Sequence, residues 1–223
     1  METTGEIKMS SWLQRLSLCA FTVLLCVSLS AGADLDSAKR AYQQKDYATA
    51  FKELTPLAER GNADAQLILG KMYWKGEGVL KDPEQAMKLF KASALQGNAD
   101  AQFFLGSIYL LPHTDIAEGV KWLRLSAEQG NQDAQWMLGK AYLQGDKALP
   151  RDPVQAEMWL WLAAKDNLEF YEKGLLAAER EMTPEQIASG KARAAAWKPK
   201  PGLRPDEKPA RDQKPRAGGK PVS

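Results

Sequence analysis

The sequence predicts an all-α solenoid of about five antiparallel helix pairs, and a repeated six-residue phrase is the first observation behind this prediction. The phrase Gly-Asn-Ala-Asp-Ala-Gln starts at Gly61, returns unchanged at Gly97 and returns with one substitution at Gly130. These starts lie 36 and 33 residues apart, which is the period at which helix pairs stack on one another. Each copy also continues with Leu-Gly and then Tyr at matching positions: Leu69, Gly70 and Tyr73; Leu105, Gly106 and Tyr109; Leu138, Gly139 and Tyr142.

Residues 34–60 precede the first copy of the phrase and are predicted to form an N-terminal capping helix pair. Small and aromatic residues recur there at helical spacing, first around Ala41 and then around Leu54. Between the two stripes, Lys45 and Asp46 interrupt the apolar pattern and indicate a turn.

Three repeats follow, at residues 61–96, 97–129 and 130–166. The glycine of the phrase suits the left-handed exit from one helix, and the asparagine after it suits the N-cap of the next. The second helix of the first and third repeats begins at Asp82-Pro83 and Asp152-Pro153, because proline is well tolerated at the first helical position. We expect the recurring Tyr73, Tyr109, Tyr142, Trp122 and Trp159 to pack between the helices.

The second repeat departs from this pattern. It has a shorter loop, around His113, between its two helices. Asp115 and Glu118, three residues apart, still indicate a capping box, so a second helix is expected here too.

Residues 167–197 are predicted to be C-terminal capping helices, because the small residues of the repeat are lost. Tyr171 and Leu176 stand where earlier copies have alanine and glycine, so no further repeat is expected to pack there. A last helix should begin at Thr183, in a capping box, and end at Trp197. Residues 198–223 are rich in proline and charge, with no apolar period, and we expect a disordered basic tail.

Residues 1–33 carry the pattern of a cleaved signal peptide. Arg15 precedes an apolar stretch over residues 16–30, and small residues follow up to Ala33, after which we expect cleavage. The stretch is shorter than the roughly 20 apolar residues of a spanning helix. Either Met1 or Met9 can serve as the initiator. Both cysteines lie in this segment, and the mature chain is expected in the periplasm of a Gram-negative bacterium.

Charge is unevenly distributed along the chain. Residues 198–223 hold eight Lys or Arg against three Asp or Glu, so the tail carries +5. Residues 1–33 are neutral and the whole chain carries +2, which leaves −3 on residues 34–197. An acidic body makes nucleic acid an unsuitable partner for an exported protein. The basic tail is either a solvated linker or a weak contact to anionic cell wall or membrane, where each basic residue contributes about 1 kcal/mol.

The repeated motifs resemble those of the Sel1-like repeat family, relatives of the tetratricopeptide repeats. The resemblance rests on Gly-Asn-Ala-Asp-Ala-Gln, Leu-Gly, Tyr, the Gly-Glu-Gly-Val loop at residues 76–79 and Asp-Pro, and it covers about Asp36 to Trp197. It implies a right-handed superhelix with a concave groove used for protein–protein interaction, and exported members look like adaptors or regulators of envelope and signalling complexes. The penicillin-hydrolysing members have cysteines in every repeat, which this mature chain lacks.

No constellation in the sequence points to catalysis, a cofactor or a metal. His113 is the only histidine, and a metal site or general base would need partners beside it. Gly76-Glu77-Gly78 lacks the Gly-Lys-Ser/Thr of a phosphate-binding loop, and a glycine after a helix serves as a C-cap.

Three tryptophans fall outside the repeat's fixed apolar positions and are the candidate partner-binding residues: Trp74, Trp136 and Trp161. Aromatic residues are enriched in binding hot spots, although core packing is an equal alternative for these three. Lys75 and Lys140 are further candidates and, with Lys121 and Arg124, are expected either to line one binding face or to form a solvated one.

These observations predict a non-catalytic periplasmic scaffold or adaptor that binds a protein partner through the concave face of the solenoid. The alternatives are an envelope hydrolase and a protein that binds cell wall or another anionic polymer through groove and tail.

Overall fold

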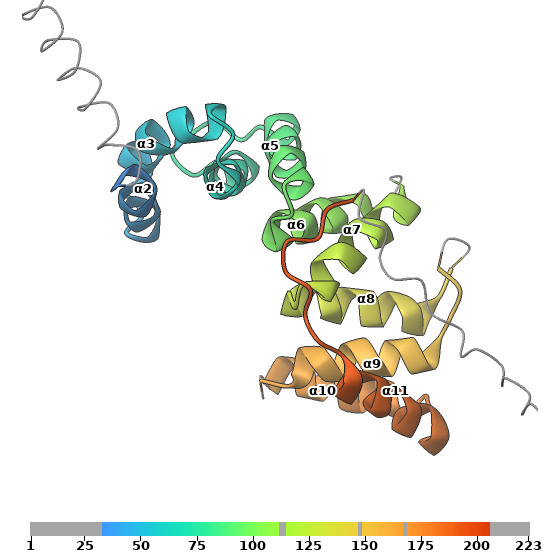
Figure 1. The fold of residues 1–223 in the computed structure, drawn as a ribbon. Coiled ribbons are helices and arrows are strands. Elements are labelled where there is room, and N and C mark those ends of the chain that lie inside the picture. Colours follow the sequence, from blue (N-terminus) through green and yellow to red (C-terminus); the bar gives the residue numbers. More distant parts are fainter. Residues whose placement is uncertain (1–32, 112–114, 147–148, 167–168, 206–223) are drawn as a thin grey trace, which may run out of the picture. The chain divides into compact units, whose positions relative to one another are not determined.

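The computed structural model describes residues 33–111, 115–146, 149–166 and 169–205. Over these residues it contains ten α-helices and no strand (Figure 1). The predicted all-α architecture of helix pairs is therefore confirmed. The chain divides into two compact units, Met1–Lys81 and Asp82–Ser223, and the boundary falls inside the first repeat, in the loop between its two helices.

The first unit contains α2 (Ala33–Gln43), α3 (Tyr47–Glu59) and α4 (Ala63–Lys75). Lys45 forms the turn between α2 and α3 with a φ of 63°, and Asp46 caps α3 by accepting a hydrogen bond from the Thr49 amide. α3 packs against both α2 and α4. Residues 34–60 therefore hold two helices joined by a turn at Lys45 and Asp46.

The second unit contains seven helices. They are α5 (Pro83–Leu95), α6 (Ala99–Tyr109), α7 (Ile116–Glu128), α8 (Gln132–Gln144), α9 (Pro153–Ala164), α10 (Glu169–Glu179) and α11 (Pro184–Ala196). From α5 to α9, each helix packs on the next one along the chain. Contacts between sequence neighbours are what a solenoid requires.

The repeated phrase forms the junction between successive repeats. Its glycines, Gly61, Gly97 and Gly130, have φ values of 87°, 90° and 97°, the left-handed region in which a side chain is disfavoured. Its asparagines are N-caps, as predicted: Asn62, Asn98 and Asn131 accept hydrogen bonds from the amides of Ala65, Ala101 and Ala134.

The glutamine that ends the phrase has a role that the sequence did not indicate. In each copy its buried Nε2 donates to the carbonyl eight residues earlier, at the end of the preceding helix. The pairs are Gln66 to Ala58 at 3.1 Å, Gln102 to Ala94 at 3.1 Å and Gln135 to Ala127 at 3.2 Å. This bond satisfies a carbonyl left over at a helix C-terminus, so the phrase joins two helices as well as ending and starting them.

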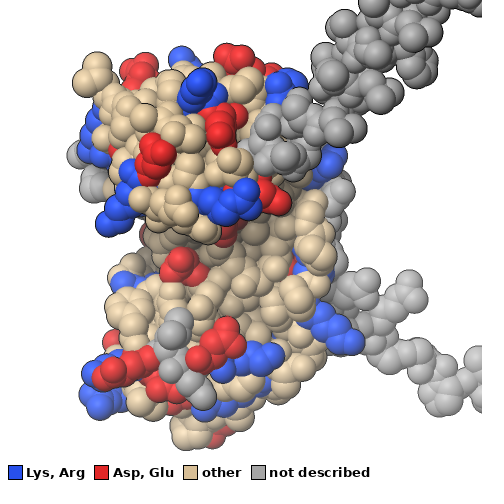
Figure 2. All heavy atoms as spheres, turned by 90° about the vertical axis from the view of Figure 1, so that its left-hand side faces the viewer, with Lys and Arg blue, Asp and Glu red and all other residues tan. Residues whose placement is uncertain are grey.

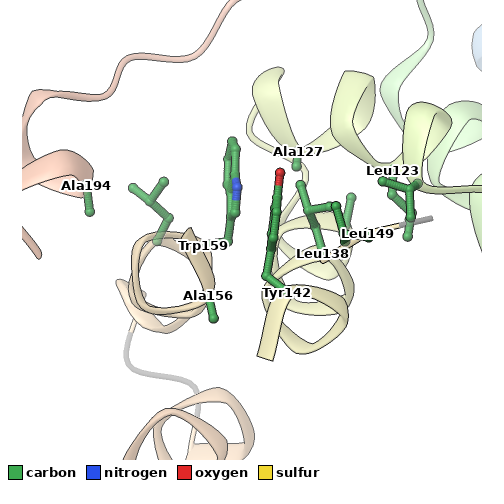
Figure 3. Packing of buried hydrophobic residues seen from close by; sticks show 11 residues of the cluster. Leu123, Ala127, Leu138, Tyr142, Leu149, Ala156, Trp159 and Ala194 are labelled. Carbon is green, nitrogen blue, oxygen red and sulfur yellow. The ribbon is translucent and has the colours of Figure 1, made fainter. Parts of the chain in front are cut away.

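Within a repeat, a glycine lets the two helices approach closely. A Cβ on Gly106 would lie 2.8 Å from the Leu123 side chain, and one on Gly139 would lie 2.8 Å from that of Leu160. The core of the second unit fills the space beside these contacts (Figure 3). Trp122, Trp159 and Tyr142 are buried, as predicted.

The C-terminal cap differs from a helix pair. α10 and α11 each pack mainly on α9 rather than on each other. Glycines let both helices approach their neighbours closely: a Cβ on Gly174 of α10 would collide with the Trp136 ring of α8, and one on Gly190 of α11 would collide with the Glu157 side chain of α9. α10 and α11 therefore both cover α9 at the C-terminal end of the helix stack.

Other helix starts follow the sequence signals. Asp82, Asp115 and Asp152 cap α5, α7 and α9, and Thr183 forms the predicted capping box with Gln186. The predicted signal peptide, apart from Ala33, and the middle of the short loop around His113 lie outside the described residues. Within the described residues, no helix has the length and apolar character needed to cross a membrane.

Candidate peptide-binding surface

Residues 197–205, called here the C-terminal segment, run back from α11 across the helix junctions to α6 (Figure 1). The sequence predicts disorder from residue 198, and the structure differs from that prediction for residues 198–205. Prolines 199, 201 and 205 cannot continue a helix and favour extended chain in the residue before them. Residues 206–223 of the predicted tail lie outside the described residues.

The segment is anchored at its start by an aromatic contact. Trp197 ends α11, and its ring packs edge-on against Trp159 of α9, with 6.2 Å between the ring centroids. The chain then passes Gly130, where a Cβ would lie 3.6 Å from the Pro199 side chain. α11 therefore directs the segment onto the junction between α7 and α8.

Lys200 is bound twice by the last residue of α7. Its amide donates to the Glu128 carbonyl at 2.8 Å, and its Nζ lies 2.5 Å from the Glu128 carboxylate. The Glu128 side chain is only 15% exposed, so this ion pair is less screened than one between two solvated side chains.

Two glutamines bind adjacent main-chain groups of the segment. The Gly202 amide donates to Oε1 of Gln129 at 2.6 Å, and Nε2 of Gln102 donates to the Leu203 carbonyl at 2.7 Å. The glutamines are themselves joined, because Nε2 of Gln129 donates to Oε1 of Gln102 at 2.7 Å. This network orients both amides towards the segment.

The glycine of the repeat phrase lets the segment approach here. A Cβ on Gly97 would lie 2.7 Å from the Gly202 carbonyl oxygen. Gly202 has a φ of 77°, which glycine adopts without strain. We call the surface formed by Gly97, Gln102, Glu128, Gln129 and Gly130 the peptide track.

A pocket of about 340 Å³ lies where the described chain ends. Its lining is Pro205 together with a row of α7 residues, namely Ala117, Val120, Lys121, Arg124, Leu125 and Glu128. The Arg124 guanidinium is held in place because it donates to the Tyr142 hydroxyl at 2.6 Å. The pocket thus combines an apolar floor with two cations and adjoins the peptide track at Glu128.

The structure places the predicted binding residues in different surroundings. The Trp136 ring contacts Phe170, Tyr171 and Gly174 of α10, so it packs the C-terminal cap. Lys140 is exposed and lies over the Trp136 ring at 6.0 Å. Trp161 is half-buried against the core cluster of the second unit.

Trp74 and Lys75 belong to the first unit. Trp74 is partly buried on α4, while Lys75 is exposed and lies 3.7 Å from the Glu77 carboxylate. Of the four cations expected on one face, Lys121 and Arg124 do line the same pocket. On the face shown in Figure 2, basic and acidic side chains are interspersed rather than gathered by sign.

The residues of the peptide track were missed by sequence reasoning, although a signal for the segment exists. Six of the eight basic residues after Trp197 are followed directly by proline. Repeated pairs of a basic residue and proline favour an extended conformation. A disordered tail does not need such a repeat. For the track itself the sequence offers a recurring glutamine directly before the first glycine of the phrase, at Gln96 and Gln129.

One buried carboxyl group stands apart from the track. Glu157 of α9 is fully buried, 4.0 Å from Lys191, which in turn lies 2.8 Å from Glu179. Burial raises the pKa of Glu157 to about 7, and the neighbouring Glu179 carboxylate adds to this rise. No cluster of three or more potential metal ligands occurs in the described part of the chain.

Comparison with known proteins identifies the repeat. The Sel1 repeat family matches residues 63–98, 99–131 and 132–168. This chain contains three Sel1 repeats. The matched repeats begin two residues later than the boundaries drawn from the glycines, because the family unit starts inside the first turn of its first helix.

Two solved Sel1-type structures resemble the chain. A protective antigen of uropathogenic Escherichia coli with an SLR fold is 32% identical, with a TM-score of 0.58 over 67% of this chain. The match covers 34% of the antigen, so the chain spans about one third of its length. A Sel1 repeat protein from Oxalobacter formigenes is 27% identical, with a TM-score of 0.60 over 72% of this chain and 69% of that one. No curated protein matches the chain.

Sel1 repeats are typically modules for protein–protein interaction. The peptide track lies on the second of the matched repeats, with Gly97 at the end of the first. In this chain the surface of these repeats therefore holds a segment of the same chain.

Proposed function

We propose that this chain, with its three Sel1 repeats, is a non-catalytic scaffold that binds a protein partner through the peptide track. One observation carries the proposal: the helix junctions hold a non-helical segment of chain through hydrogen bonds to its main-chain groups. Contacts to main-chain groups can be made by many sequences, which suits a surface that receives part of another protein.

The alternatives have less support. Glu157, the described carboxyl group with the most perturbed pKa, is fully buried against α11 and is not open to a substrate. Interspersed charges on the face in Figure 2 do not suit a broad polyanion. We therefore keep the hydrolase and the polymer-binding protein as outcomes of the test.

The test is affinity capture of the mature protein from envelope extract, with a matched pair of variants. Gln129→Ala removes a side chain that faces the C-terminal segment. Both variants are made in a chain that ends at Lys198, so that the C-terminal segment does not occupy the track. Recovery of a defined partner by Gln129→Ala should then fall about tenfold, because one lost hydrogen bond with an unpaired partner costs about 1–2 kcal/mol. Gln96→Ala, at the equivalent position one repeat earlier, is the control and should recover the partner as the shortened chain without a substitution does.

Equal recovery by both variants would exclude the track as the binding surface. Recovery of polysaccharide in place of protein would favour the polymer-binding alternative, and turnover of an envelope substrate would favour the hydrolase.

We further propose that the scaffold acts in the periplasm, on the evidence of the signal-peptide pattern in residues 1–33. N-terminal sequencing of the protein from a periplasmic fraction should start at Asp34. Protein found in the cytoplasm with Met1 or Met9 still attached would contradict export.

A further inference from the structure

We propose that the peptide track accepts, from another protein, a peptide in which a basic residue is followed by a proline-glycine turn, and that the chain's own C-terminal segment is a built-in competitor for it. This proposal rests on the proposed function, and it specifies the ligand and its regulation. The bound segment itself, Lys200-Pro201-Gly202-Leu203, provides the pattern.

The spacing of prolines in the segment matches the donors that the track needs. Amides 200 and 202 donate to Glu128 and Gln129. The residue directly before each of these two donors, at positions 199 and 201, is proline, which has no amide hydrogen. A ligand can therefore carry proline at every second position without losing a hydrogen bond to the track, and it gains rigidity from the proline rings.

Two side-chain features add specificity to these main-chain contacts. The Glu128 carboxylate selects a basic residue at the position of Lys200. The position of Gly202 requires glycine, because its φ of 77° disfavours a side chain and Gly97 faces its carbonyl. An acidic residue at the first position or a bulky one at the second should be rejected.

The segment competes because it is tethered. α11 ends at Ala196, only four residues before Lys200. A short linker gives an effective concentration in the millimolar range, so a free peptide of equal intrinsic affinity binds poorly until the segment leaves. The contacts are few and the segment is mostly exposed, so it can leave without unfolding a helix.

The experiment uses the full mature chain and a fluorescein-labelled peptide with the sequence of residues 197–205. The variant Lys200→Glu/Gly202→Ala weakens the tethered segment, since it reverses the charge opposite Glu128 and strains the glycine position. Fluorescence anisotropy should show binding to this variant that is about tenfold tighter than to the unaltered chain. The control is Lys198→Glu, which replaces a basic residue by an acidic one at another exposed position of the segment. This control should bind the peptide as weakly as the unaltered chain does.

Specificity is tested by a charge exchange between peptide and track. A peptide with glutamate at the position of Lys200 should not bind the loosened variant. Its binding should be restored by Glu128→Lys in a chain that carries Lys200→Ala/Gly202→Ala, because the tethered segment then has no carboxylate to pair with the new cation. Equal binding of both peptides, or no binding of either, would overturn the proposal.

The remaining outcomes separate this proposal from the proposed function. If the peptide fails to bind but capture still recovers a partner through Gln129, the scaffold stands and the ligand pattern is wrong. The unaltered chain is also examined by analytical ultracentrifugation. If it sediments as a dimer and Lys200→Glu dissociates that dimer, the track is occupied by the segment of a second copy. That result would overturn the proposal that the chain's own segment is the competitor.

Discussion

Glu157 shows how a single buried side chain links stability to pH. It lies on the face of α9 that α11 covers, with Glu179 and Lys191 beside it. In the ionised form its two oxygens have no hydrogen-bond donor. Once protonated, it can donate to the Glu179 carboxylate, so the folded chain favours the protonated form and the pKa rises to about 7.

We expect the free energy of unfolding of the second unit to fall as pH rises from about 4.5 to above 7. The folded-state pKa of Glu157 lies above the ordinary value, so the folded chain binds more protons than the unfolded one in this window, and that stability is lost as the proton leaves. The rise of roughly two and a half pH units corresponds to about 3 kcal/mol at most. Urea unfolding followed by tryptophan fluorescence at pH 5 and pH 8 measures the fall.

Glu157→Gln should remove most of this dependence and unfold at higher urea than the unaltered chain at pH 8. Glu169→Gln, at an exposed position, is the control and should leave the dependence unchanged. A Glu157→Gln variant with the same pH profile as the unaltered chain would show that Glu157 does not titrate in this range.

Helices and their junctions could be predicted from sequence because their signals are local. Glycine, asparagine and aspartate act on the backbone within a few residues, so the caps at Asn98, Asp152 and Thr183 follow from the sequence. Contacts across a long sequence separation have no such signal. The bond from Gln102 to Leu203 spans 101 residues, so the track could not be found in this way.

The candidate tryptophans show the same limit of local signals. Trp136 lies outside the repeat's apolar positions because it packs the cap rather than another repeat, against Gly174, which the repeat pattern does not include. A departure from the period therefore indicates an unusual neighbour, which can be a cap as well as a partner. Binding of a partner by the five candidates stays a prediction: Trp74, Trp136, Trp161, Lys75 and Lys140.

The phrase glutamine allows a test of how the helices are joined. Gln135→Ala removes the bond from Nε2 to the Ala127 carbonyl and leaves space at a position only 3% exposed. We expect a loss of about 1–2 kcal/mol in the free energy of unfolding, measured by urea titration. Gln144→Ala, at the exposed end of α8, should change it by less than about 0.5 kcal/mol. Equal effects would mean that the bond contributes no stability.

At the largest scale, elements outside the repeat cover part of the second unit. α10 and α11 cover α9, and the C-terminal segment then returns over the junctions of α7 with α8 and of α5 with α6. The basic tail therefore falls into two parts. Residues 198–205 contribute Lys200 to an ion pair with the acidic body, while residues 206–223 hold five basic and three acidic residues.

This division predicts different outcomes for two truncations. A chain that ends at Pro205 keeps the contacts of Lys200, Gly202 and Leu203 and should melt at the same temperature as the full chain. A chain that ends at Lys198 keeps Trp197 against Trp159 but loses all three contacts. With about 1 kcal/mol lost in total, after allowing for exposure, its melting temperature should fall by about 2–4 °C. Calorimetry of the three chains gives the comparison, and a fall that already appears on truncation at Pro205 would place stabilising contacts beyond that residue.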